Sequence, residues 1–269
     1  MKKSIVSVKI KNDRCFLRND STKKSQKGNK MKISLCIPMY NEEKIIDSTL
    51  NTISSYMDKN FGDDYEVLFI NDGSKDKCAQ KVEEFSSKNG KIKLIEYGQN
   101  MGKGYAVRQG VLASQGEVIM FTDCDLAYGC DVIKTFFDRM QETNADVAVG
   151  SRNLDKSGYE GYSFARKIIS KTYIKVLCVI GNLKLSDSQC GCKAFRSEMG
   201  KKVFSYCEVN RFAFDFEAIL LATKFKASII EIPVRIIENS ESSMHIVRDS
   251  IKMVKDIISM KKRIKKIKE

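Results

Sequence analysis

Apolar strands that alternate with amphipathic helices constrain the fold of this sequence more than any other feature. Short apolar runs predict strands over 32–37, 65–70, 91–96, 117–122 and 146–150. Apolar residues at helical spacing predict helices between them, over 42–57, 75–88, 102–114 and 131–142. Strands joined by helices pair in parallel, because each helix returns the chain to the same end of the sheet. We therefore predict an α/β protein with a mainly parallel sheet flanked by helices.

Polar motifs stand at the ends of four predicted strands, over 38–43, 71–74, 123–125 and 150–152. One such motif is ordinary loop chemistry. In a parallel sheet, however, all carboxyl ends lie at one edge, and ligands bind there. Four polar motifs along that edge predict a binding site.

Asp123 and Asp125 stand two residues apart, directly after an apolar strand. In extended backbone, residues i and i+2 point the same way, so the two carboxylates can share one divalent cation. Diphosphate oxygens would complete the coordination shell. The alternative is a loop with two solvated aspartates, and the position after a buried strand, opposite Asp72, disfavours it.

Gly102 and Gly104 open a predicted helix and flank Lys103. Glycines allow a ligand to approach the backbone closely, and a helix N-terminus favours anions. The spacing matches neither a P-loop nor a dinucleotide-binding fingerprint. This argues against an ATPase and against a nicotinamide-dependent enzyme.

Charge is concentrated at the two ends of a chain whose net charge is +13. Residues 1–30 hold ten basic and two acidic residues, residues 248–269 hold nine and three, and the middle is nearly neutral. A nucleic-acid-binding domain would carry its basic patch on the folded body. Basic ends suit an anionic membrane surface, or serve only solubility. We predict no nucleic-acid partner.

The cysteine and histidine content limits which metal sites and catalytic mechanisms the chain can have. The nine cysteines show no repeated spacing, which indicates a reducing compartment, and His245 is the sole histidine. A structural zinc site and a histidine-dependent nucleophile are both disfavoured. We expect no signal peptide and no transmembrane helix, and a flexible N-terminal arm over 1–30.

Two segments combine apolar and basic residues at helical spacing. Residues 246–269 predict a basic amphipathic helix that lies on a membrane surface, through Met260, Ile264 and similar side chains. Residues 164–183 are a second candidate, with an apolar side (Phe164, Ile168, Tyr173, Leu177, Ile180) and a lysine side (Lys167, Lys171, Lys175). For each segment, packing on the protein body is the alternative.

The ordered motifs resemble the inverting family 2 glycosyltransferases of GT-A fold. The segments that carry this resemblance are 37–43 (IPMYNEE), 71–74 (NDGS), 100–108 (NMGKGYAVR) and 123–125 (DCD). Later motifs are similar to the dolichyl-phosphate β-glucosyltransferase branch and its bacterial polyprenyl-phosphate relatives; they lie at 150–152 (GSR), 187–195 (DSQCGCKAF), 211–217 (RFAFDFE), 231–234 (EIPV) and 247–250 (VRDS). The resemblance implies a Rossmann-like GT-A domain over 31–245.

The resemblance also implies roles for individual residues. The nucleotide sugar would contact Pro38, Tyr40, Glu42, Asp72, Lys103 and Asp123. Mg²⁺ or Mn²⁺ would bind Asp123 and Asp125. Catalytic roles would fall to Asp125, Arg152, Asp187, Gln189 and Asp215, with Glu217 also near the sugar and acceptor. The sequence departs from the family pattern at Asn71, where aspartate is common, and at Ala127 and Tyr128.

The reaction implied is inverting transfer of a hexose, glucose from UDP-glucose, to dolichyl or polyprenyl phosphate. A phosphate acceptor is already anionic, so it needs cations rather than a strong base. Arg152, Lys193 and Arg196 are the candidate cations. A hydroxyl acceptor would instead need Asp187 or Asp215 as general base.

Other functions stay open at this stage. They are transfer to a sugar hydroxyl in a polysaccharide or glycolipid, mannose transfer from GDP-mannose, and a catalytically silent nucleotide-sugar-binding module. A lipid acceptor implies a peripheral protein on the cytoplasmic face of a membrane. A membrane-protein partner would be compatible with that position.

Overall fold

The computed structural model describes residues 8–9, 31–160, 162–211, 213–237 and 259–267. The remainder of the predicted N-terminal arm, and residues 246–258 and 268–269 of the predicted membrane-surface helix, lie outside the described residues.

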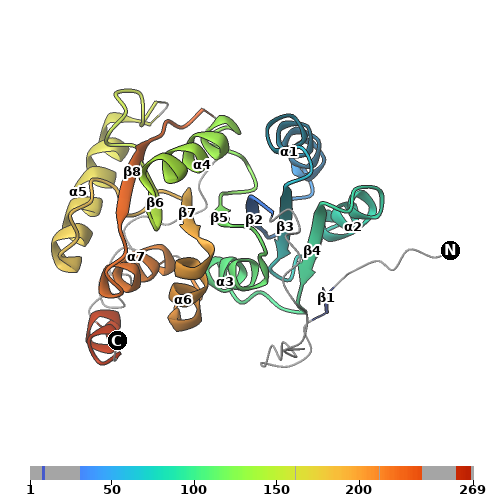
Figure 1. Ribbon diagram of the computed structural model, residues 1–269. Helices are drawn as coiled ribbons and strands as arrows, with labels where there is room; N and C mark the ends of the chain where they lie inside the picture. Colours follow the sequence, from blue (N-terminus) through green and yellow to red (C-terminus); the bar gives the residue numbers. More distant parts are fainter. Residues whose placement is uncertain (1–7, 10–30, 161, 212, 238–258, 268–269) are drawn as a thin grey trace.

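An eight-stranded sheet forms the centre of the molecule, in the order β1-β4-β3-β2-β5-β7-β6-β8 (Figure 1). The strands are β1 (Val8–Lys9), β2 (Ile33–Met39), β3 (Tyr65–Asn71), β4 (Ile92–Glu96), β5 (Val118–Phe121), β6 (Val147–Ser151), β7 (Lys193–Arg196) and β8 (Ile229–Pro233). Every neighbouring pair is parallel except the two that β7 makes, with β5 and with β6. The predicted α/β class with a mainly parallel sheet is confirmed.

Helices cover both faces of this sheet. They are α1 (Ile46–Phe61), α2 (Cys78–Lys88), α3 (Lys103–Ala113), α4 (Asp131–Thr143), α5 (Phe164–Gly181), α6 (Ser197–Tyr206) and α7 (Phe214–Lys224). Alternate side chains of β3 show the arrangement: Tyr65 and Phe69 pack with α1, α2 and α4, whereas Leu68 and Ile70 pack with α3, α6 and α7. Both faces of the central strands are therefore buried, which is why these strands are continuous apolar runs in the sequence.

Strands β7 and β8 and helices α6 and α7 were not predicted from the sequence. β7 is only four residues long and contains a buried lysine, Lys193. Every residue of α7 from Phe214 to Ala222 is buried, so this part of the helix lacks the polar side of an amphipathic helix. Neither pattern matches the periodicity on which the strand and helix predictions depended.

The end of the chain packs on the protein body. Within the helical residues 259–265, Met260 and Ile264 are buried in the core that α5 and α7 share. Lys261 donates to the carbonyl of Ile180, and Arg263 pairs with Glu208 and Glu217. Met260 and Ile264 therefore face the protein and not, as predicted, a membrane, because their apolar area is already removed from water by α5 and α7.

α5 divides its apolar residues between inside and outside. Leu177 is buried, and Tyr173 and Ile180 pack against the same core. The exposed apolar side chains of α5 are Phe164, Ile168, Ile169, Val176 and Val179. The outward apolar face is therefore a different set from the predicted one, which joined Tyr173, Leu177 and Ile180 to Phe164 and Ile168. Within the described ranges, no helix has the length and apolar character needed to span a bilayer.

Candidate active site

The predicted site residues gather where β3, β5 and β6 end. Asp72 follows β3, Asp123 and Asp125 follow β5, and Arg152 follows β6. Lys103 begins α3, and its ammonium pairs with the Asp123 carboxylate. The parallel order of β3, β2 and β5 thus brings together residues that lie far apart in the sequence.

Two loops at this edge are joined by reciprocal hydrogen bonds. The backbone NH of Asn41 donates to Ser74 Oγ at 2.9 Å, and the NH of Lys75 donates to Asn41 Oδ1 at 2.9 Å. The NH of Glu43 donates to Asp76 Oδ2 at 2.9 Å. These bonds fix the loop that carries Pro38, Tyr40 and Glu42, and Tyr40 stays 43% exposed.

Asp72 is engaged by the chain itself. Its carboxylate accepts hydrogen bonds from Tyr97 Oη at 2.8 Å, the NH of Met101 at 2.8 Å and the NH of Gly102 at 2.9 Å. The residue is 3% exposed. Asp72 therefore holds the segment that enters α3 and so positions Lys103; its predicted contact with the nucleotide base stays a prediction.

The glycines around Lys103 leave room for the protein's own chain, and the predicted approach of a ligand to this backbone stays a prediction. Gly102 has φ 101° and ψ 156°, and a Cβ there would overlap the carbonyl oxygen of Asn210. A Cβ at Gly104 would lie 2.5 Å from the carbonyl oxygen of Val209. The NH of Tyr105 donates to the Asn210 carbonyl at 3.2 Å. The glycines therefore admit the protein's own 209–211 segment, which covers the start of α3.

Charges alternate through the centre of the site. Lys103 pairs with Asp123, and Lys193 Nζ contacts Asp215 Oδ1 at 3.0 Å. Burial raises the pKa of Asp215, with Lys193 and Lys103 opposing the shift. Burial would lower the pKa of Lys103, but the carboxylates of Asp123, Asp215 and Asp125 outweigh it and raise that pKa. Lys193 is completely buried and also donates to the carbonyl of Cys190 at 2.6 Å.

Asp123 and Asp125 lie in a region of negative charge. Burial raises the pKa of Glu42, and the nearby charges of Asp125, Asp76 and Asp123 raise it further. Carboxylate oxygens are the ligands that Mg²⁺ and Mn²⁺ prefer. No cluster of three or more His, Cys, Asp or Glu side chains able to hold a metal ion occurs among the described residues. Two carboxylates are fewer ligands than a divalent cation needs, and Asp123 is paired with Lys103, so a cation here would need ligand oxygens to complete its shell.

Arg152 and Asp187 form a buried, two-pronged ion pair. Arg152 Nε lies 2.7 Å from Asp187 Oδ2, and Nη2 lies 3.1 Å from Oδ1. Arg152 is 8% exposed and Asp187 is fully buried. Burial would raise the pKa of Asp187, but the charge and hydrogen bonds of Arg152 outweigh it and lower that pKa. Asp187 therefore stays ionised and paired with Arg152, which makes it a poor proton acceptor.

Gln189 carries an unused hydrogen-bond donor. Its Nε2 is buried and has no hydrogen-bond partner within the described part of the chain. Two residues further on, a Cβ at Gly191 would lie 2.7 Å from Asp123 Oδ2, so this loop passes directly against the acidic pair. A donor in that loop suits an oxygen atom of a bound ligand.

Two sequence-based expectations are wrong. Arg196 was a candidate cation, but β7 runs antiparallel, so Lys193 lies at the site edge and Arg196 at the opposite edge, bonded to the carbonyls of Met140 and Ala145. Glu217 was expected near the sugar. Its carboxylate instead accepts from the NH groups of Glu208 and Val209 and pairs with Arg263.

Sequence reasoning missed the role of Glu231. One carboxylate oxygen, Oε1, accepts from the NH of Ser186 at 2.9 Å, from Ser186 Oγ at 2.6 Å and from the NH of Asp187 at 3.2 Å. Glu231 thereby positions the loop that carries Asp187. Its motif, 231–234, was part of the family resemblance, but a positioning role cannot be seen without the contact.

Comparison with known proteins gives consistent results. The family model described as Glycosyl transferase family 2 matches residues 34–204. Proteins named dolichyl-phosphate beta-glucosyltransferase are similar to the chain: one from Dictyostelium discoideum is 31% identical over 248 residues, covering 86% of this chain and 74% of its own. The one from Homo sapiens is 32% identical over 251 residues, covering 86% and 75%.

Solved structures share the fold. Glucosyl-3-phosphoglycerate synthase from Mycobacterium tuberculosis, in complex with Mn²⁺, uridine-diphosphate and phosphoglyceric acid, has a TM-score of 0.61 at 16% identity, covering 89% of this chain and 80% of its own. A mannosyltransferase from Pyrobaculum calidifontis, in complex with GDP-Man and Mn²⁺, has a TM-score of 0.55 at 13% identity, covering 88% and 65%. At these identities the likeness concerns the fold alone.

Proposed function

The chain belongs to glycosyltransferase family 2, and we propose that it transfers glucose from UDP-glucose to dolichyl or polyprenyl phosphate, with inversion at the anomeric carbon. The names of its relatives support the sugar and the acceptor. The choice of UDP-glucose as donor follows from the family resemblance.

The donor would lie across the strand ends that carry the polar motifs. Pro38, Tyr40 and Glu42 would line the base and ribose, and the hydrogen bonds between their loop and residues 74–76 support a fixed platform there. The exposed Tyr40 ring offers an aromatic face to a base. Lys103 would lie beside the diphosphate.

Mg²⁺ or Mn²⁺ fits the pair Asp123 and Asp125, which would hold it together with diphosphate oxygens. A bound divalent cation would neutralise the charge of the departing nucleoside diphosphate. The oxygen donors and the surrounding negative charge support this assignment.

The observation that carries the choice of acceptor is the pairing of the two candidate bases. Asp187 is occupied by Arg152, and Asp215 is occupied by Lys193. A hydroxyl acceptor needs a free carboxylate to take its proton. A lipid phosphate needs none, because it is anionic at neutral pH. Paired carboxylates therefore favour the phosphate acceptor.

Transfer to a sugar hydroxyl is the second candidate. Burial raises the pKa of Asp215, and a raised pKa is expected of a carboxylate that acts as a general base near neutral pH. In that case the enzyme would turn over its donor with a sugar acceptor in the absence of any lipid phosphate.

The test is a labelled-sugar transfer assay with purified protein, Mg²⁺ or Mn²⁺ and a short-chain polyprenyl phosphate. UDP-glucose and GDP-mannose are supplied in turn. We expect label from UDP-glucose to enter the organic phase, and Asp125→Ala to reduce transfer by at least about 100-fold, as removal of a group that supports the transition-state charge does. Asp63→Ala is the matched control, because Asp63 has a 96% exposed side chain far from these strand ends.

Two results would contradict the proposal. One is the absence of lipid label while sugar acceptors still release nucleotide, which would favour the hydroxyl-acceptor transferase. The other is full activity of Asp125→Ala with an unchanged melting temperature, which would remove Asp125 from the reaction. If label enters the lipid only from GDP-mannose, the donor is GDP-mannose and not UDP-glucose. The predicted peripheral position on the cytoplasmic face and the predicted membrane-protein partner stay predictions.

A further inference from the structure

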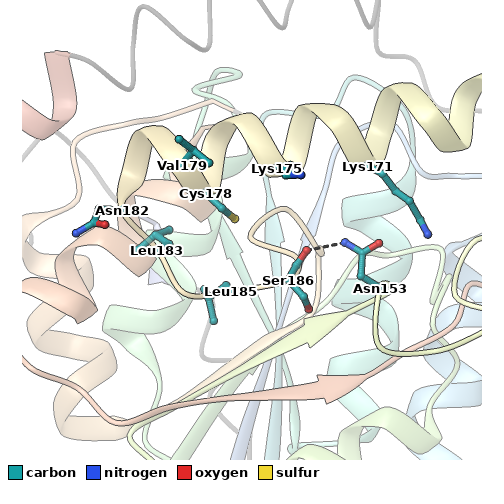
Figure 2. A pocket seen from close by; sticks show the side chains of 9 residues that line it. All are labelled: Asn153, Lys171, Lys175, Cys178, Val179, Asn182, Leu183, Leu185 and Ser186. Atoms are coloured by element: carbon teal, nitrogen blue, oxygen red, sulfur yellow. Dashed lines mark hydrogen bonds between the residues drawn. The ribbon is translucent and has the colours of Figure 1, made fainter.

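A pocket lies beneath the second half of α5, beside the active site (Figure 2). Its volume is about 560 Å³. The wall combines two lysines, three other polar residues and four apolar ones: Lys171, Lys175, Asn153, Asn182, Ser186, Cys178, Val179, Leu183 and Leu185. Of these residues, Ser186 alone was named in the site described above, as a hydrogen-bond partner of Glu231.

The polar end of the pocket is cationic. Lys171 and Lys175 are one helical turn apart, and neither makes an ion pair with any residue in the described ranges. Figure 2 shows Lys171 extending from α5 toward Asn153, whose Nδ2 donates to the carbonyl of Ser186 at 2.5 Å. Two carboxylates lie close to this end: Asp187 is paired with Arg152, and Glu231 accepts hydrogen bonds from Ser186 Oγ and from the NH groups of Ser186 and Asp187. An anion would complement this end.

Tyr159 gathers further positive charge at the same place. The centroid of its ring lies 5.3 Å from Arg152 Cζ, 5.3 Å from Lys171 Nζ and 6.0 Å from Lys167 Nζ. The cations of α5 and of the active site therefore meet around one buried ring. Because Asn153 follows Arg152, and Ser186 precedes Asp187, the pocket directly borders the active-site ion pair.

The other end of the pocket is apolar and continues onto the protein surface. Leu183 and Leu185 line it inside, and Val179 at its rim is 73% exposed. Val179 belongs to the exposed apolar face of α5, where Phe164 is 80% exposed and Ile168 is 50% exposed. An apolar helix face flanked by lysines is suited to a lipid surface.

We propose that this pocket binds the phosphate-bearing end of a lipid phosphate. The phosphate would lie between Lys171 and Lys175, and the first carbons of the lipid would lie against Leu183, Leu185 and Val179. The inference rests on the proposed function in taking this lipid to be the polyprenyl phosphate acceptor. Inorganic phosphate shares the charge but lacks the apolar part, so the two ligands are distinguishable by experiment.

Binding can be measured without any sugar donor. The chain contains no tryptophan, so Val179→Trp places a unique fluorophore at the exposed rim of the pocket. Farnesyl phosphate, farnesol and inorganic phosphate are titrated in turn. We expect a saturable change with farnesyl phosphate, and binding at least about tenfold weaker for farnesol and for inorganic phosphate, since each lacks one half of the contacts.

Charge-removing variants identify the cations. Lys171→Gln and Lys175→Gln in the reporter protein should each weaken farnesyl phosphate binding by about tenfold, the loss expected for a charged hydrogen bond. Lys201→Gln is the matched control, because Lys201 is an exposed lysine on α6. Equal binding in all three variants, or inorganic phosphate binding as tightly as farnesyl phosphate, would overturn the inference.

Transfer kinetics link the pocket to the acceptor, in protein without the reporter. Lys171→Gln and Lys175→Gln should raise KM for polyprenyl phosphate by about tenfold and leave KM for the nucleotide sugar unchanged. Unchanged KM for both substrates would overturn the acceptor assignment. If farnesyl phosphate binds as expected but no sugar reaches any lipid, the proposed function fails and the pocket stands. If sugar is transferred to lipid but the lysine variants have no effect, the proposed function stands and the pocket assignment fails.

Discussion

At the scale of single residues, the charges of this site are held in buried pairs. Arg152 with Asp187, and Lys193 with Asp215, each bury both partners. A buried charge is costly unless a partner neutralises it. The loss of one member therefore leaves the other buried and uncompensated, with its full desolvation penalty. These pairs therefore fix the geometry of the strand ends as well as their charge.

Asp187→Asn tests this directly. The change leaves the Arg152 guanidinium buried without an anion, and we expect a loss of about 3–5 kcal/mol in the free energy of unfolding. Glu142→Gln is the control, because it removes one member of an exposed pair with Arg139 and should cost less than about 1 kcal/mol. Denaturant unfolding measures both. Equal costs would show that the buried pair contributes no more than a surface one.

The pH dependence of stability follows from the lowered pKa of Asp187. A carboxylate with a lowered folded-state pKa stabilises the protein above its unfolded pKa, about 3.9 for aspartate, and loses that contribution as the pH falls through the folded value. The difference in unfolding free energy between the parent and Asp187→Asn should therefore be constant from about pH 7 to 5 and shrink below about pH 4. A difference that shrinks between pH 7 and 5 would contradict the assigned direction.

At the scale of secondary-structure elements, the entry to α3 depends on its contact with the 209–211 segment. Gly102 occupies backbone angles that only glycine adopts readily, and its missing side chain leaves room for the Asn210 carbonyl. Lys103 is the next residue, so the position of its ammonium depends on this contact.

Gly102→Ala should lower the free energy of unfolding by about 2 kcal/mol or more, from backbone strain of about 1–3 kcal/mol and the clash with Asn210. Transfer activity should fall with it, because Lys103 shifts. Gly90→Ala is the control: a Cβ there meets no atom within 4 Å, and we expect a change within about 0.5 kcal/mol. If both variants unfold at the same denaturant concentration, the close approach at Gly102 does not constrain the site.

At the scale of the whole molecule, two basic and apolar segments of similar composition differ in position. The 259–267 segment turns Met260 and Ile264 into the core, whereas α5 turns Phe164, Ile168 and Val179 outward. α5 also carries the lysines that border the pocket. In the described residues, the outward apolar face suited to a lipid surface is therefore that of α5.

Ile264→Ala tests whether the end of the chain is part of the folded body. The substitution leaves a cavity against α5 and α7, and we expect a loss of about 2–5 kcal/mol, with the melting temperature lowered by roughly 2–4 °C per kcal/mol. Lys265→Ala, at the exposed neighbouring position, should leave the melting temperature nearly unchanged. Similar melting curves for the two variants would mean that this segment adds little to stability.

The sequence by itself determined the first half of the fold and the location of the site. Strands such as β2 and β3 are buried on both faces, so they are continuous apolar runs in the sequence. The polar motifs that follow them indicate the binding edge. The family resemblance came from the same ordered motifs. These features are local, because each depends on residues close together in the chain.

Only the tertiary structure decided what each charged or glycine residue does. Lys193 reaches the site and Arg196 does not, because β7 is antiparallel. Asp187 pairs with Arg152, which lies 35 residues earlier in the sequence. Gly102 leaves room for a segment that lies more than 100 residues later. Such partners are set by which distant elements pack together. A short segment carries no record of that packing, so its residue types were predictable but their contacts were not.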